Sequence, residues 1–349
     1  MKVFSDMHHQ GLYQSLQMLI EQRLGWELYR PIGIEWATEG YWMNAKIYNN
    51  HPDTIKQYLE IRHAIPTKMG PRNEVVDENE DYYTIQNSFL NEKAITLDQF
   101  RRMKPDIVIA SYYDNVEPFL KLAKEIGAKF IMQMGNVWPV PWDIVNNVLA
   151  STGKFPVPTG KNVVFYHQEF DLDVFHKGEP DFNSKKIASF VHCLSEHDIF
   201  KQDWIDFQEL EKLMPEYEFK SYGISNRDGT IVEQKDLADT MRECKFAVHL
   251  KGGGDGFGHT IHSLGAVGRP VIFRGSQYKG KLAESLLIHE VTGFDADRLS
   301  LNEIAERIRF QKEEEYNQMC KNVYKTFKGV VDFEREFKEI LEPFFNNLL

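Results

Sequence analysis

The chain has 349 residues, which is enough for two domains of ordinary size. Its formal net charge is −11, from 41 Lys and Arg against 52 Asp and Glu, and this disfavours nucleic acid and anionic membranes as partners. No apolar run reaches the ~18 residues of a membrane span, the start MKVFSDMHHQ lacks a signal-peptide core, and the cysteines lie far apart as in reduced proteins, so we expect a cytoplasmic protein.

The start of the chain predicts the opening of a Rossmann-like domain. Met1–Ser5 is a short apolar strand, Asp6–Gly11 is a polar loop, and apolar residues recur at helical spacing through 12–23. Gly25 ends that helix, and Trp26–Arg30 is the second strand. The glycine fingerprint of a dinucleotide site is absent, which disfavours NAD.

The segment 31–100 shows little periodicity, and we expect insertions in it. Asp77–Asp81 is predicted to be an acidic loop. Regular order returns with a strand at Asp106–Ala110, a helix at Pro118–Ile126 and a strand at Lys129–Gln133. Because ligands bind at the carboxyl ends of parallel strands, the loops after these two strands are expected at the ligand edge of the sheet.

The second half repeats the alternation of strands and helices. A Pro/Gly break at Phe155–Gly160 and a strand at Asn162–Tyr166 precede a domain boundary that we place near residue 170. The elements expected beyond it are Lys186–His192, Asp198–Leu213, Glu218–Tyr222, Gln234–Cys244, Leu301–Arg309, Glu313–Phe327 and Phe333–Phe345.

The stretch Lys245–Phe273 organises this half. Phe246–Leu250 is an apolar strand, a glycine-rich turn follows, and a helix is expected from near His259 to Gly268. Such a turn exposes backbone N–H groups at the positive end of the helix dipole, which suits a phosphate. The alternative is a plain connection between a strand and a helix, since glycine turns are common there.

One motif in this stretch resembles the donor-binding motif of the GT-B nucleotide-sugar glycosyltransferases, especially the retaining ones. Their motif reads Glu-Gly-Phe-Gly, four variable residues, then Glu-Ala-x-Ala-x-Gly-x-Pro-Val. The chain matches it with Asp255-Gly256-Phe257-Gly258, Ala266, Gly268, Pro270 and Val271. Asp255 stands in place of the first Glu, and Ser263 stands in place of the second, which in the family usually holds the donor ribose.

The resemblance implies an α/β fold of two Rossmann-like domains facing a cleft. Residues 1–169 would form the N-terminal, acceptor-side domain, and 170–329 would form the C-terminal domain that binds the nucleotide sugar. The helix at about 330–349 would pack back on the first domain.

The resemblance also implies which residues bind the donor. Asp255 would be catalytic and would accept hydrogen bonds from the donor sugar. A basic side chain would contact the diphosphate, and Lys201 is one candidate, although its helical position also suits a solvated surface residue. The expected donor-binding residues are Gly254, Gly256, Phe257, Gly258, His259, Ser263, Lys201 and Arg274.

On the acceptor side, the resemblance directs the loop after the first strand toward the donor. A neutral imidazole of His8 or His9 would then take a proton from the acceptor hydroxyl. The alternatives are a surface loop, a helix N-cap by Asp6, or a metal-binding pair for which no third ligand is apparent. The expected acceptor-side residues are Asp6, Gly11, Asp114 and Asn136, although such polar groups equally suit the capping of turns and helices.

The predicted function is therefore a hexosyltransferase-like glycosyltransferase that moves a sugar from a nucleotide-diphosphate sugar to a hydroxyl acceptor. We expect it to need no metal and no other cofactor, and to retain the anomeric configuration, although a histidine after the first strand also occurs in inverting enzymes. Three alternatives remain open: a degenerate GT-B protein that binds a nucleotide or partner without turnover, a nucleotide-sugar epimerase, and an enzyme that glycosylates nucleic-acid bases.

Overall fold

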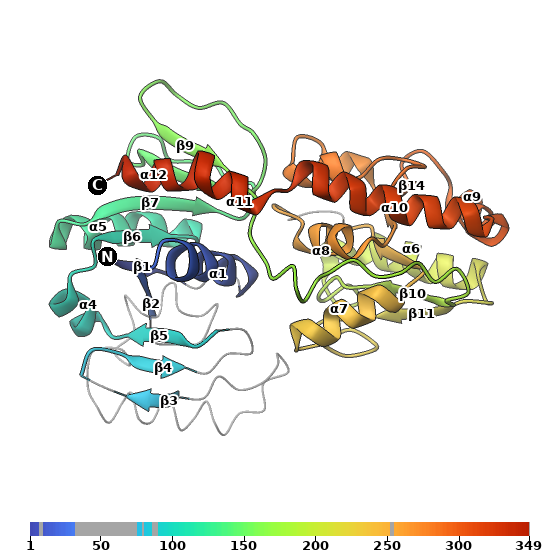
Figure 1. Cartoon of the computed structure of the whole chain (residues 1–349), viewed down its shortest axis with the longest axis horizontal. Coiled ribbons are helices and arrows are strands. Elements are labelled where there is room, and N and C mark those ends of the chain that lie inside the picture. The colour runs from blue at the N-terminus through green and yellow to red at the C-terminus, as the bar shows by residue number, and fades with distance from the viewer. Residues whose placement is uncertain (7–9, 32–74, 79, 86–89, 252–254, 349) are drawn as a thin grey trace. The chain divides into compact units, whose positions relative to one another are not determined.

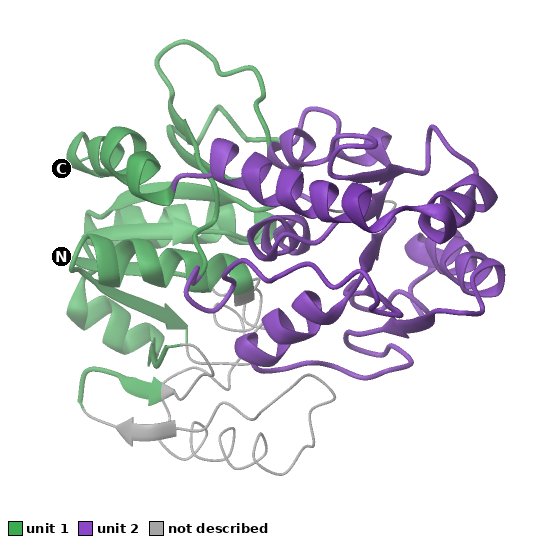
Figure 2. Cartoon of the chain, turned by 45° about the vertical axis from the view of Figure 1, so that its right-hand side comes forward, with its two compact units in different colours: residues 1–67, 71–170, 333–349 green, residues 68–70, 171–332 purple. Residues whose placement is uncertain are grey.

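Two β-sheets, one in each half of the chain, carry the fold (Figure 1). The structure is a computed structural model and describes residues 1–6, 10–31, 75–78, 80–85, 90–251 and 255–348. The chain divides into two compact units, of which the first comprises 1–67, 71–170 and 333–349 and the second 68–70 and 171–332 (Figure 2). Among the described residues, no helix has both the length and the hydropathy needed to cross a membrane.

The sheet of the first unit has, among the described residues, nine strands in the order β3-β4-β5-β2-β1-β6-β7-β8-β9. At one edge, β4 pairs antiparallel with both β3 and β5, and the remaining neighbours pair parallel. The order reverses at β1, so the switch point of this sheet lies between β1 and β6. The strands are β1 Lys2–Ser5, β2 Glu27–Pro31, β3 Val75–Glu78, β4 Tyr83–Ile85, β5 Glu92–Ile95, β6 Ile107–Ala110, β7 Lys129–Met134, β8 Asn147–Ala150 and β9 Asn162–Phe165.

Both faces of this sheet are covered, because its central strands are apolar on both sides. On β1, for example, Phe4 and Val3 belong to opposite core clusters. Phe4 packs with α4 (Leu97–Met103) and α5 (Val116–Ile126). The cluster of Val3 is covered by α1 (Gln10–Gln17), its π-helical continuation Met18–Arg23, the segment Phe337–Leu341 that follows α11 (Phe333–Glu336), and α12 (Glu342–Asn346).

The chain leaves the first unit after Phe170 and returns to it at Phe333, and these two crossings lie side by side. The rings of Phe170 and Phe333 meet edge to face, with 5.4 Å between their centroids. The guanidinium of Arg23 donates from Nε to Glu169 at 2.9 Å and pairs with Glu334. The returning segment is therefore tied to the outgoing one inside the first unit.

The second unit has, in the described part of the chain, a five-stranded parallel sheet in the order β11-β10-β12-β13-β14. The order reverses at β10, so its switch point lies between β10 and β12. The strands are β10 Lys186–Ser189, β11 Glu218–Ser221, β12 Phe246–His249, β13 Val271–Phe273 and β14 Gly293–Asp295. The helices are α6 Lys201–Leu213, α7 Gln234–Glu243, α8 His259–Val267, α9 Leu301–Phe310 and α10 Glu313–Val330.

Short 3₁₀ turns complete both units. They are Tyr113–Asn115, Asp198–Phe200, Gly275–Tyr278 and Leu282–Leu286.

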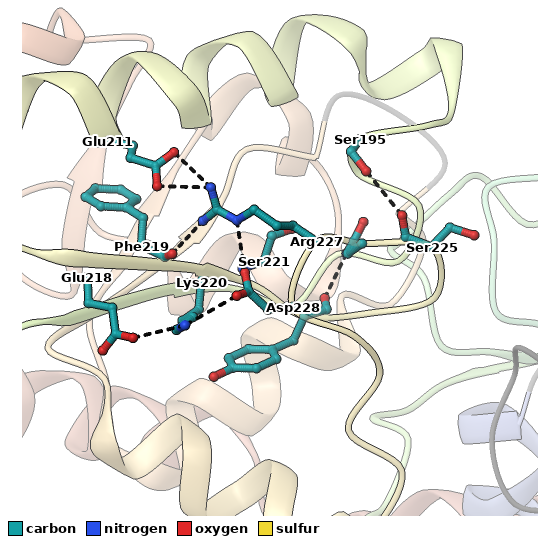
Figure 3. A network of polar contacts seen from close by, with 11 residues as sticks. Ser195, Glu211, Glu218, Phe219, Lys220, Ser221, Ser225, Arg227 and Asp228 are labelled. Carbon is teal, nitrogen blue, oxygen red and sulfur yellow. Dashed lines mark hydrogen bonds and ion pairs between the residues drawn. The ribbon is translucent and has the colours of Figure 1, made fainter.

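An ionic network fixes the turn after β11 (Figure 3). Arg227 in this turn bonds both carboxylate oxygens of Glu211 on α6 at 3.0 Å, and it also donates to the carbonyl of Phe219. Asp228 accepts from Arg227 at 3.2 Å and from the backbone N–H of Ser221 at 2.7 Å. Because Arg227 and Asp228 together contact α6 and two residues of β11, this network is a stronger constraint than a single surface ion pair, and it holds the turn to both its strand and its helix.

The predicted α/β class with a Rossmann-like sheet in each half is confirmed, and the strands and helices expected in the second half are found within a few residues of their predicted bounds. The expected acidic loop at Asp77–Asp81 is wrong at its start, because β3 runs to Glu78. β3 is an edge strand, and edge strands tolerate charged residues. The segment 31–100 also contains β4, β5 and the start of α4, which its sequence did not predict, and β8 was missed as well.

Candidate active site

The turn between β12 and α8 lies at the switch point of the second sheet. It ends at Gly258, whose φ of 77° is in the left-handed region, and α8 begins at His259. A Cβ at Gly258 would also lie 3.1 Å from the Cβ of Ala283. Both the backbone angle and the close approach therefore require glycine, and Gly258 sets the direction in which the first turn of α8 presents its N–H groups.

Asp255 is the centre of a polar cluster in this turn. Its Oδ2 accepts a hydrogen bond of 2.8 Å from the hydroxyl of Tyr278 and lies 3.1 Å from Nε2 of His249. Its Oδ1 accepts from the ammonium of Lys251 at 3.2 Å. The ammonium of Lys281 donates to its backbone carbonyl. The cluster therefore places one carboxylate and two ammonium groups just before α8.

These contacts keep the carboxyl group of Asp255 ionised. Burial by itself would raise its pKa, but the hydrogen bond and charge of His249, the charge of Lys251 and the hydrogen bond from Tyr278 hold that pKa well below its ordinary 3.8. Burial and the neighbouring carboxylate raise the pKa of the Tyr278 hydroxyl well above 10.0. At neutral pH, Tyr278 is therefore a hydrogen-bond donor and Asp255 an acceptor.

Lys251 also faces the segment that follows β10. Its ammonium is 5.9 Å from the ring centroid of Phe200. Burial lowers the pKa of His192, and the charge of Lys251 lowers it further. The side chain of Lys251 is 24% exposed, so it is open to a ligand. Its ammonium thus stands near the ends of both β10 and β12, on either side of the switch point.

The two histidines of α8 differ in their surroundings. Nδ1 of His262, which is buried, donates to the carbonyl of Gly258 at 2.9 Å, and its ring stacks on Phe257 with 3.9 Å between centroids. Burial lowers the pKa of His259 to about 4, against the opposing effect of the Asp255 charge. His262 therefore holds the turn, whereas His259 supplies a neutral imidazole at the start of the helix.

Three of the predicted donor-binding residues lie apart from this cluster. Ser263 is only 4% exposed within α8. Lys201 is exposed at the first residue of α6, and Arg274 pairs with Asp206 and Asp297. None of the three forms a hydrogen bond or an ion pair with Asp255. Gly256 and Phe257 are buried in the turn itself, and Gly254 lies outside the described residues.

Asp6 follows β1 at the switch point of the first sheet, and its carboxylate is fully engaged. It accepts from the backbone N–H groups of Ser111 at 2.6 Å and Tyr112 at 3.0 Å, and from the side-chain amide of Asn115 at 2.8 Å. Burial raises its pKa, although these hydrogen bonds act to lower it. Since Asp6 is 1% exposed, the structure gives it a role in holding the loop after β6.

The other acceptor-side predictions lie in different segments of the first unit. Asp114 is exposed in the loop after β6, and Asn136 is partly buried in the loop after β7. Gly11 is buried in α1. His8 and His9 lie outside the described residues.

Sequence reasoning missed His249, Lys251, Tyr278 and Lys281 as members of the cluster. Lys251 alone carried a usable signal, because it directly follows a strand at the switch point and precedes the glycine turn. Tyr278 and Lys281 come from beyond β13, and only the tertiary packing of that segment brings them to Asp255.

Comparison with known proteins gives matches among solved structures only. No family model matches the chain, and no curated protein matches it. Anabaena Alr3699/HepE in complex with UDP-glucose matches with 12% identity over 99% of each chain and a TM-score of 0.64. A glycosyltransferase from Rickettsia africae matches with 13% identity over 99% of this chain and 98% of that one, with a TM-score of 0.59.

A third match is the pneumococcal O-GlcNAc transferase GtfA in complex with UDP and GlcNAc. It shares 11% identity over 100% of this chain and 98% of that one, with a TM-score of 0.54. Since these likenesses extend over nearly the whole chain, and since both sheets have the parallel, reversing strand order of Rossmann-like domains, the chain has the GT-B fold.

Proposed function

We propose that this protein is a glycosyltransferase that moves a sugar from a nucleotide-diphosphate sugar to a hydroxyl acceptor. The observation that supports this most is the ionised carboxylate of Asp255, held beside Lys251 and Lys281 at the start of α8. The matched structures of Alr3699/HepE and GtfA contain UDP-glucose and UDP with GlcNAc, respectively, and a donor of that class carries a diphosphate that this cluster suits.

The chemistry of transfer explains why such a cluster is useful. Breaking the bond between the anomeric carbon and the diphosphate leaves negative charge on the diphosphate and positive charge on the sugar ring. The ammonium groups of Lys251 and Lys281, with the N–H groups at the start of α8, stabilise the first charge. The carboxylate of Asp255 accepts hydrogen bonds from donor hydroxyls and stabilises the second.

This proposal assigns the contact with the diphosphate to Lys251 and Lys281 instead of Lys201 or Arg274. In it, the two ammonium groups act where other glycosyltransferases use a divalent metal. The resemblance of the turn to the retaining motif supports retention of the anomeric configuration. Proton NMR of the glycoside product, compared with the donor, decides between retention and inversion.

The first experiment is a thermal shift against UDP, GDP, ADP, CMP and their sugar conjugates. A ligand that binds only the folded state raises the unfolding midpoint, by about 2.7 kcal/mol at a hundredfold excess over its dissociation constant. We expect one diphosphate to give a selective shift. Lys251→Ala should reduce that shift strongly, whereas Lys201→Ala, which removes an exposed ammonium, should leave it unchanged. The absence of any shift would contradict the proposal.

The second experiment measures nucleotide release from the selected donor in the presence and absence of candidate acceptors. Wild-type protein should release nucleotide in an acceptor-dependent way. Asp255→Asn keeps the size of the side chain but removes its charge, so transfer should fall at least ~10-fold while nucleotide binding persists. Turnover at the wild-type rate in this variant would remove Asp255 from the catalytic site.

One observation favours a second candidate function, a GT-B protein that binds a nucleotide without turnover. The buried hydroxyl of Ser263 stands where the related motif has a carboxylate that usually holds the ribose. A selective thermal shift without nucleotide release, with or without acceptor, would support this second function over the first.

A further inference from the structure

An aromatic cavity lies at the ligand edge of the first sheet, in the loops that follow β6 and β7. Its volume is about 310 Å³, and it is lined by Tyr112, Tyr113, Asp114, Trp138 and Pro139. Because β6 borders the switch point beside β1, this is the part of the sheet where a ligand is expected.

The three rings are arranged around Trp138. Its ring meets Tyr112 edge to face at 5.7 Å between centroids, and it meets Tyr113 at 6.3 Å. Tyr113 is 39% exposed, and both Tyr112 and Trp138 are partly buried. The rings therefore support one another while part of their surface stays open to a ligand.

The loop that carries the tyrosines is held in place before any ligand binds. The buried carboxylate of Asp6 accepts from the backbone N–H groups of Ser111 and Tyr112 and from the side chain of Asn115. These charge-assisted hydrogen bonds tie the loop to the end of β1. A loop that is ordered in advance loses less entropy when it binds a ligand.

The chemistry of the lining selects the class of ligand. A pyranose ring has a face of C–H groups, which packs on the negative face of an aromatic ring, and an edge of hydroxyl groups, which need hydrogen-bond acceptors. The rings supply the first kind of contact, and the exposed carboxylate of Asp114 supplies the second. Among the described residues that line the cavity there is no Lys or Arg, and the charged one is Asp114, which would repel a phosphate.

We propose that this cavity binds a pyranose ring of the acceptor, so that the acceptor of the transfer is a carbohydrate. That the bound sugar is the acceptor of a transfer rests on the proposed glycosyltransferase function. The binding of the sugar itself rests only on the rings, the carboxylate and their place on the sheet.

The test is saturation-transfer NMR on the full chain, with methyl α-D-glucopyranoside and methyl β-D-galactopyranoside as probes. D-Sorbitol, which has hydroxyl groups but no ring face, is the control ligand. We expect transfer to the ring protons of at least one glycoside and none to sorbitol. Trp138→Ala should weaken that binding about 10-fold, which corresponds to ~1.4 kcal/mol.

The matched control variant is Phe310→Ala, which removes another exposed ring, 75% exposed on α9 of the second unit. It should bind the glycoside as the wild type does. Tyr113→Ala provides a second variant at an exposed position, in case Trp138→Ala does not fold, and circular dichroism checks the fold of each. No transfer to either glycoside, equal transfer to sorbitol, or unchanged binding in both cavity variants would overturn the proposal.

The nucleotide thermal shift, measured on the same samples without sugar, separates the two proposals. Trp138→Ala should keep the nucleotide shift of the wild type while it binds the glycoside about 10-fold more weakly. A nucleotide shift without glycoside binding would overturn the sugar site and leave the proposed function standing. Glycoside binding without any nucleotide shift would overturn the role of the cavity as an acceptor site, together with the proposed function.

Discussion

Burial affects the pKa values of single residues in the candidate site as much as neighbouring charges do. Asp255 stays ionised although it is largely buried, because a histidine, a lysine and a tyrosine all turn their donors toward it. For His259, a short distance along the chain, burial outweighs the opposing charge of Asp255 and lowers its pKa to about 4. Acid therefore destabilises the folded protein through both groups. Protonation removes the charge of Asp255 that its neighbours stabilise, and it places a charge on the buried ring of His259.

His259 predicts a dependence of stability on pH. Its pKa falls from 6.5 to about 4 in the folded protein because it is buried. As the pH drops, this histidine takes up its proton in the unfolded chain before it does so in the folded protein. Its contribution to the free energy of unfolding is therefore complete above about pH 6.5. That contribution decreases between about pH 6.5 and about pH 4. The free energy of unfolding of the wild type, measured with urea, should decrease across this pH window. In His259→Gln it should decrease less.

The control for that experiment is His176→Gln, at an exposed position in the second unit. It should keep the pH dependence of the wild type. An identical slope in His259→Gln and in the wild type would show that His259 does not titrate in this way.

At the same scale, the sequence pointed to the candidate residues whose position depends on their immediate neighbours. Asp255 and Gly258 could be found because a strand, a turn and a helix start follow one another within the stretch that contains them. Arg274 was a reasonable candidate for a diphosphate, but it is engaged by Asp206 and Asp297, which are distant in sequence. Lys281 was missed for the same reason, since no local pattern indicates what a side chain meets across a fold.

At the scale of elements, the position of α8 depends on the glycine at its start. Gly258→Ala should destabilise the protein, because alanine is strained at a φ of 77° and its Cβ would press on Ala283 at 3.1 Å. We expect a loss of about 2 kcal/mol in the free energy of unfolding, and a weaker nucleotide shift because the N–H groups of the first turn move.

Gly268→Ala is the matched control at the other end of the same helix. Its φ is 76°, but the nearest atom to its Cβ would be at an ordinary 3.5 Å. It should cost about 1 kcal/mol, from the backbone angle alone, and should leave nucleotide binding intact. Equal losses in the two variants, measured by urea unfolding, would show that the contact with Ala283 has no effect.

The elements that the sequence did not predict are those formed by distant pairing. β8 has only three apolar residues in a row and becomes a strand between β7 and β9. β4 pairs antiparallel with β3 and β5 at one edge of an otherwise parallel sheet, in a segment without clear alternation. By contrast, α8, α9 and α10 have their periodicity and their end signals in their own sequences.

At the scale of the whole molecule, each unit has its own core, so the two should respond separately to mutation and to ligand. Phe345 is fully buried in the first unit and meets Trp26 edge to face at 5.7 Å. Phe345→Ala should lower the stability of that unit by ~3–5 kcal/mol. Scanning calorimetry should show an earlier first-unit transition, while the nucleotide still raises the transition of the second unit.

Phe310→Ala, which truncates an exposed ring, should change neither transition by more than ~0.5 kcal/mol. If calorimetry instead shows one unfolding transition, which the Phe345 variant lowers and the nucleotide raises, the two units unfold together.

The crossings after Phe170 and before Phe333 affect the order of events during synthesis on the ribosome. The first unit needs residues 333–349, whose Leu341, Phe344 and Phe345 complete the core around β1. All of the second unit is translated before those residues emerge. The second unit can therefore fold first, although domains are usually completed from the N-terminus onward. Until the final helices arrive, the nascent first unit carries an uncovered apolar face of β1 and α1, which is the kind of surface that chaperones protect.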